Sequence, residues 1–293
     1  MSKSTSAPSA TILALLQRYS YRRYLALQAG LFVRRGEAVS RPARWSRALR
    51  AFFKYPLTQD RARPFLSFPD HPVALKMREE VVESNRRVDA LGLVPHKALE
   101  KNWDFLNAFS AILLRDRLDD VVVDMGSGRN SVILRWLALY GYKRLYGCDL
   151  IAEPHVEGPV EYTVQNIEQT NYPDHFADVI TCLSVIEHGV DTVRFLAECE
   201  RLLKPGGLLI ISTDYWQTPL DLEGVEDELG PVHIFSAESL KAALFDPAEQ
   251  GGLRVAGQPD FTCDQPVVAR PSVPQIDGKY TFYFMRFQKA QIP

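Results

Sequence analysis

The stretch VVVDMGSGRN, residues 121–130, decides the fold class of this 293-residue chain. Its first half consists of four apolar residues and Asp124 and predicts a buried strand, and Gly126, Ser127 and Gly128 follow directly. Glycines after a strand allow a sharp turn and a close approach to a ligand, because no Cβ is in the way. A third glycine is replaced by Asn130. The stretch therefore predicts a strand, a glycine turn and a helix whose first amides face a ligand.

Expected strands and helices alternate from residue 120 to the end of the chain, which predicts a mostly parallel sheet with helices on both faces. Helices are expected at 130–141, 191–207 and 236–245. We expect an α/β fold with a doubly wound, Rossmann-like, seven-stranded sheet whose last strand is antiparallel. The strands are expected at residues 120–125, 144–150, 160–167, 177–186, 206–215, 254–263 and 279–288.

The part before residue 120 is expected to be helical, and we divide it in two. Residues 1–72 are interpreted as a basic helical extension and linker, and residues 73–119 as a helical lid or connector to the sheet domain at 120–293. Residues 1–10 are small and polar and are expected to be disordered. Helical spacing is found at 11–35, 42–54, 74–93 and 100–117, and prolines between 56 and 72 break the chain.

The net charge of −2 is unevenly distributed. Residues 1–65 hold 13 Lys or Arg against only Glu37 and Asp60, a net +11, which leaves 21 basic and 34 acidic residues for the rest of the chain. Such a basic arm suggests an anionic partner: a membrane surface reached through residues 1–60, a phosphorylated glycan lipid or nucleic acid. The alternative is that the arm packs on the acidic body, as a lid or an oligomer contact.

The cysteines and the absence of long apolar runs indicate a cytoplasmic protein, with peripheral attachment to a membrane as an alternative. The four cysteines have no C-x-x-C spacing, and two of them, Cys148 and Cys182, fall in expected strands, so buried thiols are expected rather than disulfides or zinc. No run reaches the about 20 apolar residues that span a bilayer. Arg18, Arg22 and Arg23 interrupt the N-terminal apolar run, which argues against a secretory signal.

Candidate binding residues follow the ends of successive strands, where doubly wound sheets bind ligands. The first strand ends in Asp124 and the glycine turn, and the second ends in Asp149 and Leu150. A carboxylate there can accept hydrogen bonds from both hydroxyls of a ribose. The third strand ends in Asn166 and Ile167, and the fourth in Ser184, Glu187 and His188. Each signal is weak alone, but their order and spacing together predict a cofactor site.

From about Trp103 to Gln288 the sequence resembles the class I S-adenosylmethionine-dependent methyltransferases, especially the branch that methylates hydroxyls of small molecules and glycans. The resemblance rests on VVVDMGSG, LYGCDL, QNIEQTNYPDHFADVITCLSVIEH, ECERLLKPGGLLIIST and PVHIFSAESLKAAL. It implies S-adenosylmethionine as cofactor. Its methionine part would lie on the loop of Asp124, Gly126, Ser127 and Gly128, and its ribose on Asp149. Asn166 and Ile167 would then lie at the adenine, with Ser184 where the fourth strand opens on the cofactor.

The family pattern D-x-G-x-G-x-G departs here at Asn130, a residue that tolerates left-handed backbone angles better than most. A nicotinamide-dependent dehydrogenase is the rival, because Asp149 also follows a glycine loop at a suitable distance. The dehydrogenase pattern needs a glycine at position 131, which is Ser131. The sequence therefore favours a sulfonium cofactor over a dinucleotide.

For the chemistry we expect in-line methyl transfer to a hydroxyl of a glycan or small metabolite, which calls for a general base. The candidates are His188 and His233. No metal is expected, because no histidine or carboxylate cluster has ligand spacing. Two alternatives stay open: a non-catalytic binding or scaffold protein that uses the basic arm, and an RNA-directed methyltransferase, although no RNA-binding motif is found.

Overall fold

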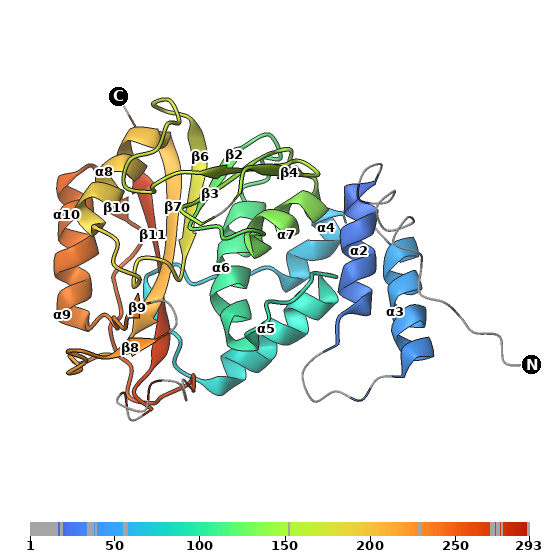
Figure 1. The fold of residues 1–293 in the computed structure, drawn as a ribbon, viewed down its shortest axis with the longest axis horizontal. Helices are drawn as coiled ribbons and strands as arrows, with labels where there is room; N and C mark the ends of the chain where they lie inside the picture. Colours follow the sequence, from blue (N-terminus) through green and yellow to red (C-terminus); the bar gives the residue numbers. More distant parts are fainter. Residues whose placement is uncertain are drawn as a thin grey trace, which may run out of the picture.

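A mixed nine-stranded sheet, with helices on both faces, forms the centre of the computed structural model (Figure 1). The structure describes residues 17, 20–33, 38, 40–54, 58–151, 153–227, 230–269, 273, 276 and 278–291. The disorder expected at 1–10 and the beginning of the helix expected at 11–35 lie outside these residues.

Five parallel strands make the middle of the sheet, in the order β5, β3, β2, β6, β7. They are β2 (Val121–Met125), β3 (Arg144–Asp149), β5 (Val160–Val164), β6 (Ala177–Leu183) and β7 (Leu203–Tyr215). The strand order reverses at β2, which lies between β3 and β6. The glycine turn at the end of β2 is therefore at the point where doubly wound sheets bind ligands.

Beyond β7, the sheet continues with antiparallel strands. Strand β11 (Thr281–Lys289) runs antiparallel to β7, and β10 (Leu253–Val255) pairs with β11. All seven expected strands and the α/β class are confirmed. The expected count of seven needs correction, because β4 (His155–Glu157) pairs with β5 and β1 (Val73–Ala74) with β11, giving nine. Strand β10 is shorter than expected, since Gly257 turns the chain with a φ of +82° against the backbone of Asp70.

The helices expected in the sheet domain begin within two residues of their predicted starts, but the helix expected at 191–207 ends at Leu202, directly before β7. Helix α7 (Val132–Tyr140) begins at Ser131, whose hydroxyl accepts a hydrogen bond from the Leu134 amide, and ends at Gly141 with a φ of +102°. Asp191 caps α8 (Thr192–Leu202) in the same way. Helices α5 (Arg78–Ala90), α6 (Asn102–Leu113), α9 (Ala237–Leu240) and α10 (Asp246–Gln250) and the β8–β9 hairpin (Glu226–Asp227 with Gly230–Pro231) complete this part.

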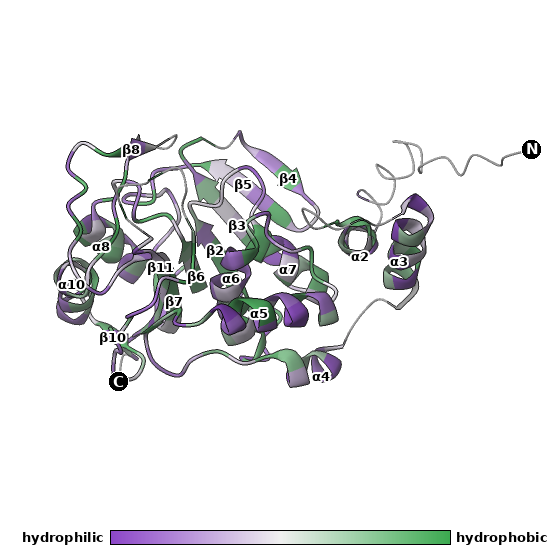
Figure 2. Cartoon of the chain, turned by 90° about the horizontal axis from the view of Figure 1, so that it is seen from below, coloured by the Kyte–Doolittle hydropathy of each residue, from purple (hydrophilic) through white to green (hydrophobic). Residues whose placement is uncertain are grey.

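Helix α2 (Tyr21–Leu31) packs on α7, and α3 (Arg41–Lys54) lies on its outer side, as Figures 1 and 2 show from two directions. The two helices approach closely at Gly30, where an added Cβ would lie 2.4 Å from Cα of Ala48. Arg44 and Arg47 of α3 donate 3.0 Å hydrogen bonds to the carbonyls of Leu31 and Gly30 at the end of α2. Cations at a helix C-terminus are favourable because they meet its negative dipole end.

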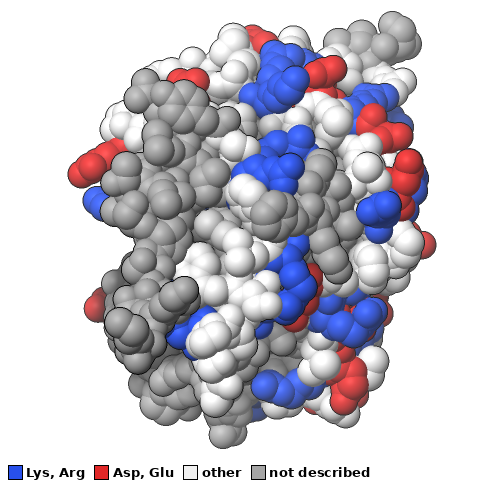
Figure 3. All heavy atoms as spheres, turned by 90° about the vertical axis from the view of Figure 1, so that its right-hand side faces the viewer, with Lys and Arg blue, Asp and Glu red and all other residues white. Residues whose placement is uncertain are grey.

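Lys and Arg side chains gather in a band on the face of the molecule at the α3 side (Figure 3). Part of this charge is used within the fold, by Arg44 and Arg47 and by Arg22, whose Nε donates to the Leu139 carbonyl at 2.9 Å. No helix in the described part of the chain is both long and apolar enough to cross a membrane. All four cysteines are buried free thiols, which confirms that expectation for Cys148 and Cys182.

Candidate functional site

A cavity of about 490 Å³ opens at the carboxyl ends of β2, β6 and β7. It is closed on one side by the segment that leads into α6 and on the other by the segment before β11. It is lined by His96, Ala98, Glu100, Lys101, Phe105, Asp124, Gly126, Ser127, Gly128, Asn130, Ser131, Val132, Leu183, Ser184, Glu187, His188, Asp214, Val268, Ala269, Tyr280 and Phe282.

The glycine turn forms one wall of this cavity. Gly126 has a φ of +78°, and an added Cβ would lie 2.4 Å from a methyl carbon of Val185. Gly128 has a φ of +58°, and an added Cβ would meet no described atom within 4 Å. Asn130 does not need the left-handed backbone considered for it, because Asp116, His175 and Ser184 are the only described non-glycine residues with positive φ. The turn is therefore completed by ordinary backbone at Asn130.

Two carboxylates hold the glycine turn. Oδ2 of Asp149, at the end of β3, accepts a 2.8 Å hydrogen bond from the Gly128 amide, and its Oδ1 accepts one from the Ile151 amide at 3.0 Å. Asp124 is buried, with Oδ1 accepting a 2.6 Å hydrogen bond from Thr181. Burial raises the pKa of Asp124 to about 6, against the lowering effect of its hydrogen bonds. Carboxylates at the ends of β2 and β3 thus lie on either side of the glycine turn.

Lys101, at the start of α6, crosses to the carboxyl ends of β6 and β7. Its Nζ donates to Oγ of Ser184 and lies 3.6 Å from Oδ1 of Asp214 and 3.8 Å from the ring centre of Phe282. Ser184 is in the left-handed backbone region with a φ of 56°, which is strained for a non-glycine residue and is frequent at functional sites. Tyr280 donates a 2.8 Å hydrogen bond to the same Oδ1 of Asp214.

The floor of the cavity has more buried carboxylates than cations. Asp104 lies behind the lining, with Oδ2 accepting a 2.6 Å hydrogen bond from Ser212, and burial raises its pKa. Burial and the nearby charge of Asp214 raise the pKa of Glu187, whose Oε2 accepts from Thr213 at 3.0 Å. Lys101 is their nearest cation. Because a bound cation would stabilise the charged forms of these carboxyl groups, such a floor favours a ligand that carries positive charge.

The structure separates the two candidate bases. His188 is exposed at the mouth of the cavity, directly after Glu187. His233 does not line this cavity; it lies in another of about 400 Å³, beside Pro219, Leu220 and Ser239. A third histidine, His96, stacks on Phe105 with ring centres 5.3 Å apart and lines the first cavity. Desolvation lowers the pKa of His96, which favours the neutral ring.

The residues expected at the adenine lie at the end of β5, outside the lining of the cavity. Ile167 is buried, while Asn166 is exposed and its Oδ1 accepts a 2.9 Å hydrogen bond from the Glu168 amide. Leu150, beside Asp149, is 67% exposed. Of the residues expected at the cofactor, the cavity brings together Asp124, Gly126, Ser127, Gly128 and Ser184, with Asp149 joined through Gly128.

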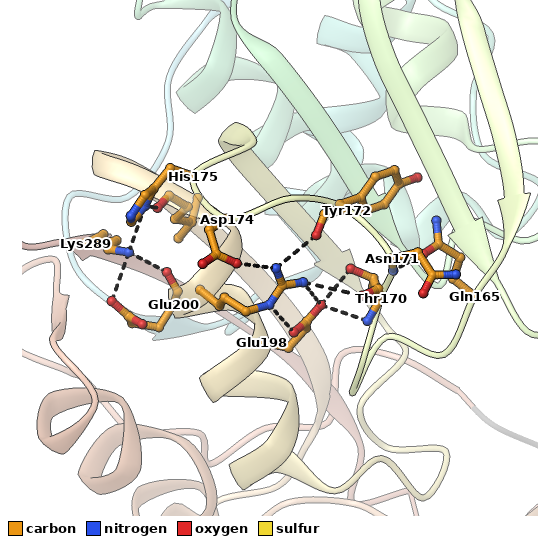
Figure 4. Close-up of polar contacts among 11 residues, drawn as sticks. Gln165, Thr170, Asn171, Tyr172, Asp174, His175, Glu198, Glu200 and Lys289 are labelled. Carbon is orange, nitrogen blue, oxygen red and sulfur yellow. Dashed lines mark hydrogen bonds and ion pairs between the residues drawn. The ribbon is translucent and has the colours of Figure 1, made fainter.

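The loop that follows Asn166 is fastened to α8, as the close-up in Figure 4 shows. Arg201 donates to the Tyr172 carbonyl at 2.9 Å, to Asp174 at 2.6 Å and to Glu198. Glu198 in turn accepts from the amide and hydroxyl of Thr170. These contacts hold the chain between β5 and β6 and so fix where β5 ends.

Sequence reasoning missed His96, Lys101 and Tyr280 as site residues. Each lies outside the strand-end motifs: His96 falls between two expected helices, Lys101 at the beginning of the helix expected at 100–117, and Tyr280 at the beginning of the strand expected at 279–288. No local pattern distinguished them from other polar or aromatic residues. Among the described residues, no group of three or more His, Cys, Asp or Glu side chains is arranged to hold a metal.

Comparison with known proteins adds independent information. Residues 123–211 match a family of methyltransferase domains. The chain is 31% identical over 150 residues to the ubiquinone biosynthesis O-methyltransferase of Coxiella burnetii. The alignment covers 46% of this chain and 63% of that protein. It is 31% identical over 128 residues to a Mycolicibacterium smegmatis protein named "Probable S-adenosylmethionine-dependent methyltransferase", covering 38% of this chain and 48% of that one. The chain thus spans less than two thirds of these relatives.

Among solved structures, the chain is similar in fold to the geranyl diphosphate C-methyltransferase of Streptomyces coelicolor, which was determined with Mg²⁺, geranyl diphosphate and S-adenosyl-L-homocysteine. The superposed region covers 80% of this chain and 100% of the Streptomyces chain. Its TM-score is 0.48 at 18% identity.

Proposed function

We propose that this chain, which carries a methyltransferase domain of the class I S-adenosylmethionine-dependent family, transfers a methyl group to a hydroxyl of a small acceptor. The observation that carries the proposal is the glycine turn at the switch point of the sheet, tied by Gly128 to Asp149 and facing a cavity with an acidic floor. The resemblance to an O-methyltransferase supports oxygen as the methylated atom.

The residues present fit S-adenosylmethionine. Open space beside Gly128 leaves room for a ligand against the turn, and each oxygen of Asp149 keeps lone-pair capacity for a ribose hydroxyl. Carboxylates of Asp124, Glu187 and Asp214 line the cavity and suit a sulfonium charge. When bound, the cofactor supplies an already activated methyl group. We assign Gly126 and Ser127 to the methionine part, and Asn166, Ile167 and Leu150 to the adenine side.

A hydroxyl acceptor has to lose its proton, so a base must be within reach. We assign this role to His188, because it lines the mouth of the cavity and histidine titrates near neutral pH. His233 lines a different cavity, and we do not assign it a catalytic role. Lys101 and Tyr280 hold Asp214 and so shape the wall opposite the glycine turn.

For the acceptor we propose a small metabolite, with a glycan hydroxyl as the second choice. We also propose that the basic N-terminal residues 1–60 help the enzyme to associate with an anionic surface. The band of Lys and Arg supports this association (Figure 3). The carbonyl contacts of Arg44 and Arg47 weaken it, because they direct part of the charge to the end of α2.

Calorimetric titration with S-adenosylhomocysteine, S-adenosylmethionine and NAD tests the proposal. We expect one-to-one binding of both sulfur nucleotides and none of NAD. Binding of NAD alone would overturn the assignment of the cofactor. Folded protein that binds none of the three would favour a scaffold that keeps the fold without the reaction.

A further inference from the structure

A second cavity, of about 510 Å³, lies beside the first one and between α2 and α7. Its size is within the range of about 300–1,000 Å³ of small-molecule sites. Most of its wall is apolar, with Leu25 and Phe32 from the α2 side, Val94 and Pro95 from the segment after α5, and Trp136 from α7. Trp136 fixes that segment, because its Nε1 donates a 2.7 Å hydrogen bond to the Val94 carbonyl.

The two cavities are neighbours with a common wall. His96, Asn130 and Val132 line both of them. Asn130 and Val132 belong to the end of the glycine turn and the first turn of α7. A molecule in the second cavity therefore lies directly behind the loop that we assign to the methyl donor.

The charge of the second cavity is opposite to that of the first. Lys97 and Arg135 line it, and none of the described residues that line it carries a carboxylate. The first cavity has Glu100, Asp124, Glu187 and Asp214 in its wall. An acidic lining and a basic lining thus meet at His96, which belongs to both cavities.

We propose that the second cavity is the subsite for the body of the acceptor, a small molecule with an apolar part and one anionic group, whose hydroxyl extends past His96 into the first cavity. The apolar body packs between Leu25, Val94 and Trp136, and the anion lies toward Lys97 and Arg135. This inference rests on the proposed methyl transfer and names the class of its acceptor. A neutral glycan would leave the apolar wall without a partner and would make no use of the positive charge of Lys97 and Arg135.

Dodecanoate, kept below its micelle concentration, is a suitable probe, and dodecanol is its neutral match. Calorimetry on the full chain should show one-to-one binding of dodecanoate. Val94 lines only the second cavity, so Val94→Trp should lower dodecanoate affinity at least about tenfold by filling it. Val193→Trp is the matched control, because Val193 is 60% exposed on α8, and it should leave the affinity unchanged.

The charge is tested separately. Lys97 is exposed, and Lys97→Met should weaken dodecanoate binding about fivefold while dodecanol binding stays the same. Equal losses for both ligands would contradict an anion site. A chain that binds S-adenosylhomocysteine but not dodecanoate, or a Val94→Trp variant with unchanged affinity, would overturn the inference and leave methyl transfer intact. If the chain bound neither sulfur nucleotide but still bound dodecanoate in a Val94-dependent way, methyl transfer would be contradicted. The second cavity would then remain a site for an apolar acid.

Discussion

The amide of Gly128 donates a 2.8 Å hydrogen bond to Oδ2 of Asp149. This bond joins the glycine turn after β2 to the acidic end of β3. It places the carboxylate before any ligand arrives, so that little side-chain entropy remains to be lost on binding. The two halves of the sequence motif are thus one structural unit.

Asp149→Asn tests this unit. The amide oxygen of Asn can still accept from Gly128, but the charge is lost, and charge-assisted hydrogen bonds contribute about 1.5–3 kcal/mol each. We expect the affinity for S-adenosylhomocysteine to fall at least about tenfold. The free energy of unfolding should fall by about 1–3 kcal/mol, because Asn has no second acceptor oxygen for the Ile151 amide. Calorimetry and urea denaturation measure the two. Asp119→Asn, at an exposed position, is the control; equal affinities of the two variants would remove Asp149 from the ribose site.

The two glycines of the turn should differ in their tolerance of alanine. Gly126→Ala forces a Cβ to 2.4 Å from Val185 in addition to backbone strain, whereas Gly128→Ala meets only strain of about 1–2 kcal/mol. We expect Gly126→Ala to destabilise the protein more, and Val185→Ala to restore part of the loss. Gly128→Ala should mainly weaken S-adenosylhomocysteine binding, since its methyl group points into open space beside the turn. Equal melting temperatures for the two variants would show that the clash is relieved elsewhere.

Lys101→Met should destabilise the fold in a pH-dependent way. The variant leaves Asp104, Glu187 and Asp214 buried without their nearest cation, and removing one partner of a buried pair typically destabilises by about 3–5 kcal/mol. Burial already raises the pKa values of Asp104 and Glu187, and loss of the cation raises them further, so the folded variant binds more protons. Its deficit relative to the native chain should therefore shrink as pH falls from 8 to 5.5.

Urea denaturation at these two pH values measures that deficit. Lys143→Met, at an exposed residue, is the control and should show no pH-dependent loss. A deficit that grows toward low pH would show that Lys101 does not neutralise these carboxylates.

Ionisation of the buried Asp124 should lower the free energy of unfolding as the pH rises through the titration range of this residue. Its pKa is about 6 in the folded chain against an ordinary value of 3.8 for an aspartate, so the folded state holds the proton over this window and the unfolded state does not. Two pKa units correspond to about 3 kcal/mol. We expect the native chain to lose up to this amount relative to Asp124→Asn between pH 4 and pH 7, as measured by urea denaturation. A constant difference between the two proteins would mean that Asp124 titrates normally.

His188 and His233 should respond differently to the cofactor product. Only His188 lines the cavity of the glycine turn. On addition of S-adenosylhomocysteine, the ring proton resonances of His188 should shift in NMR spectra, and those of His233 should stay in place. His188→Gln and His233→Gln provide the assignments. A shift at His233 alone would reverse our choice of base.

Much of the sheet was predictable because its signals are local. The strand Val121–Met125 is buried on both faces, and all of its residues except Asp124 are apolar, as is typical of a buried parallel strand. Gly126 and Gly128 supply the positive φ of the turn. Asp149 could be found because strands that are adjacent in the chain also lie side by side. The extra strands β1 and β4 were missed, since two or three residues give too short a pattern to count.

The sequence by itself determined the α/β class and the placement of the glycine turn and Asp149 at the ends of successive strands, because each depends on residues that are near in the chain or repeat with the period of a strand. Only the tertiary structure decided the rest of the site. Lys101 reaches Ser184 across 83 positions of sequence, through the packing of α6 against the ends of β6 and β7. The pairing of β11 with β7 brings Tyr280 to Asp214, His233 lies in another cavity, and the second cavity is bordered by α2 and α7. Contacts between distant segments follow from how whole elements fill space, and no local pattern encodes them.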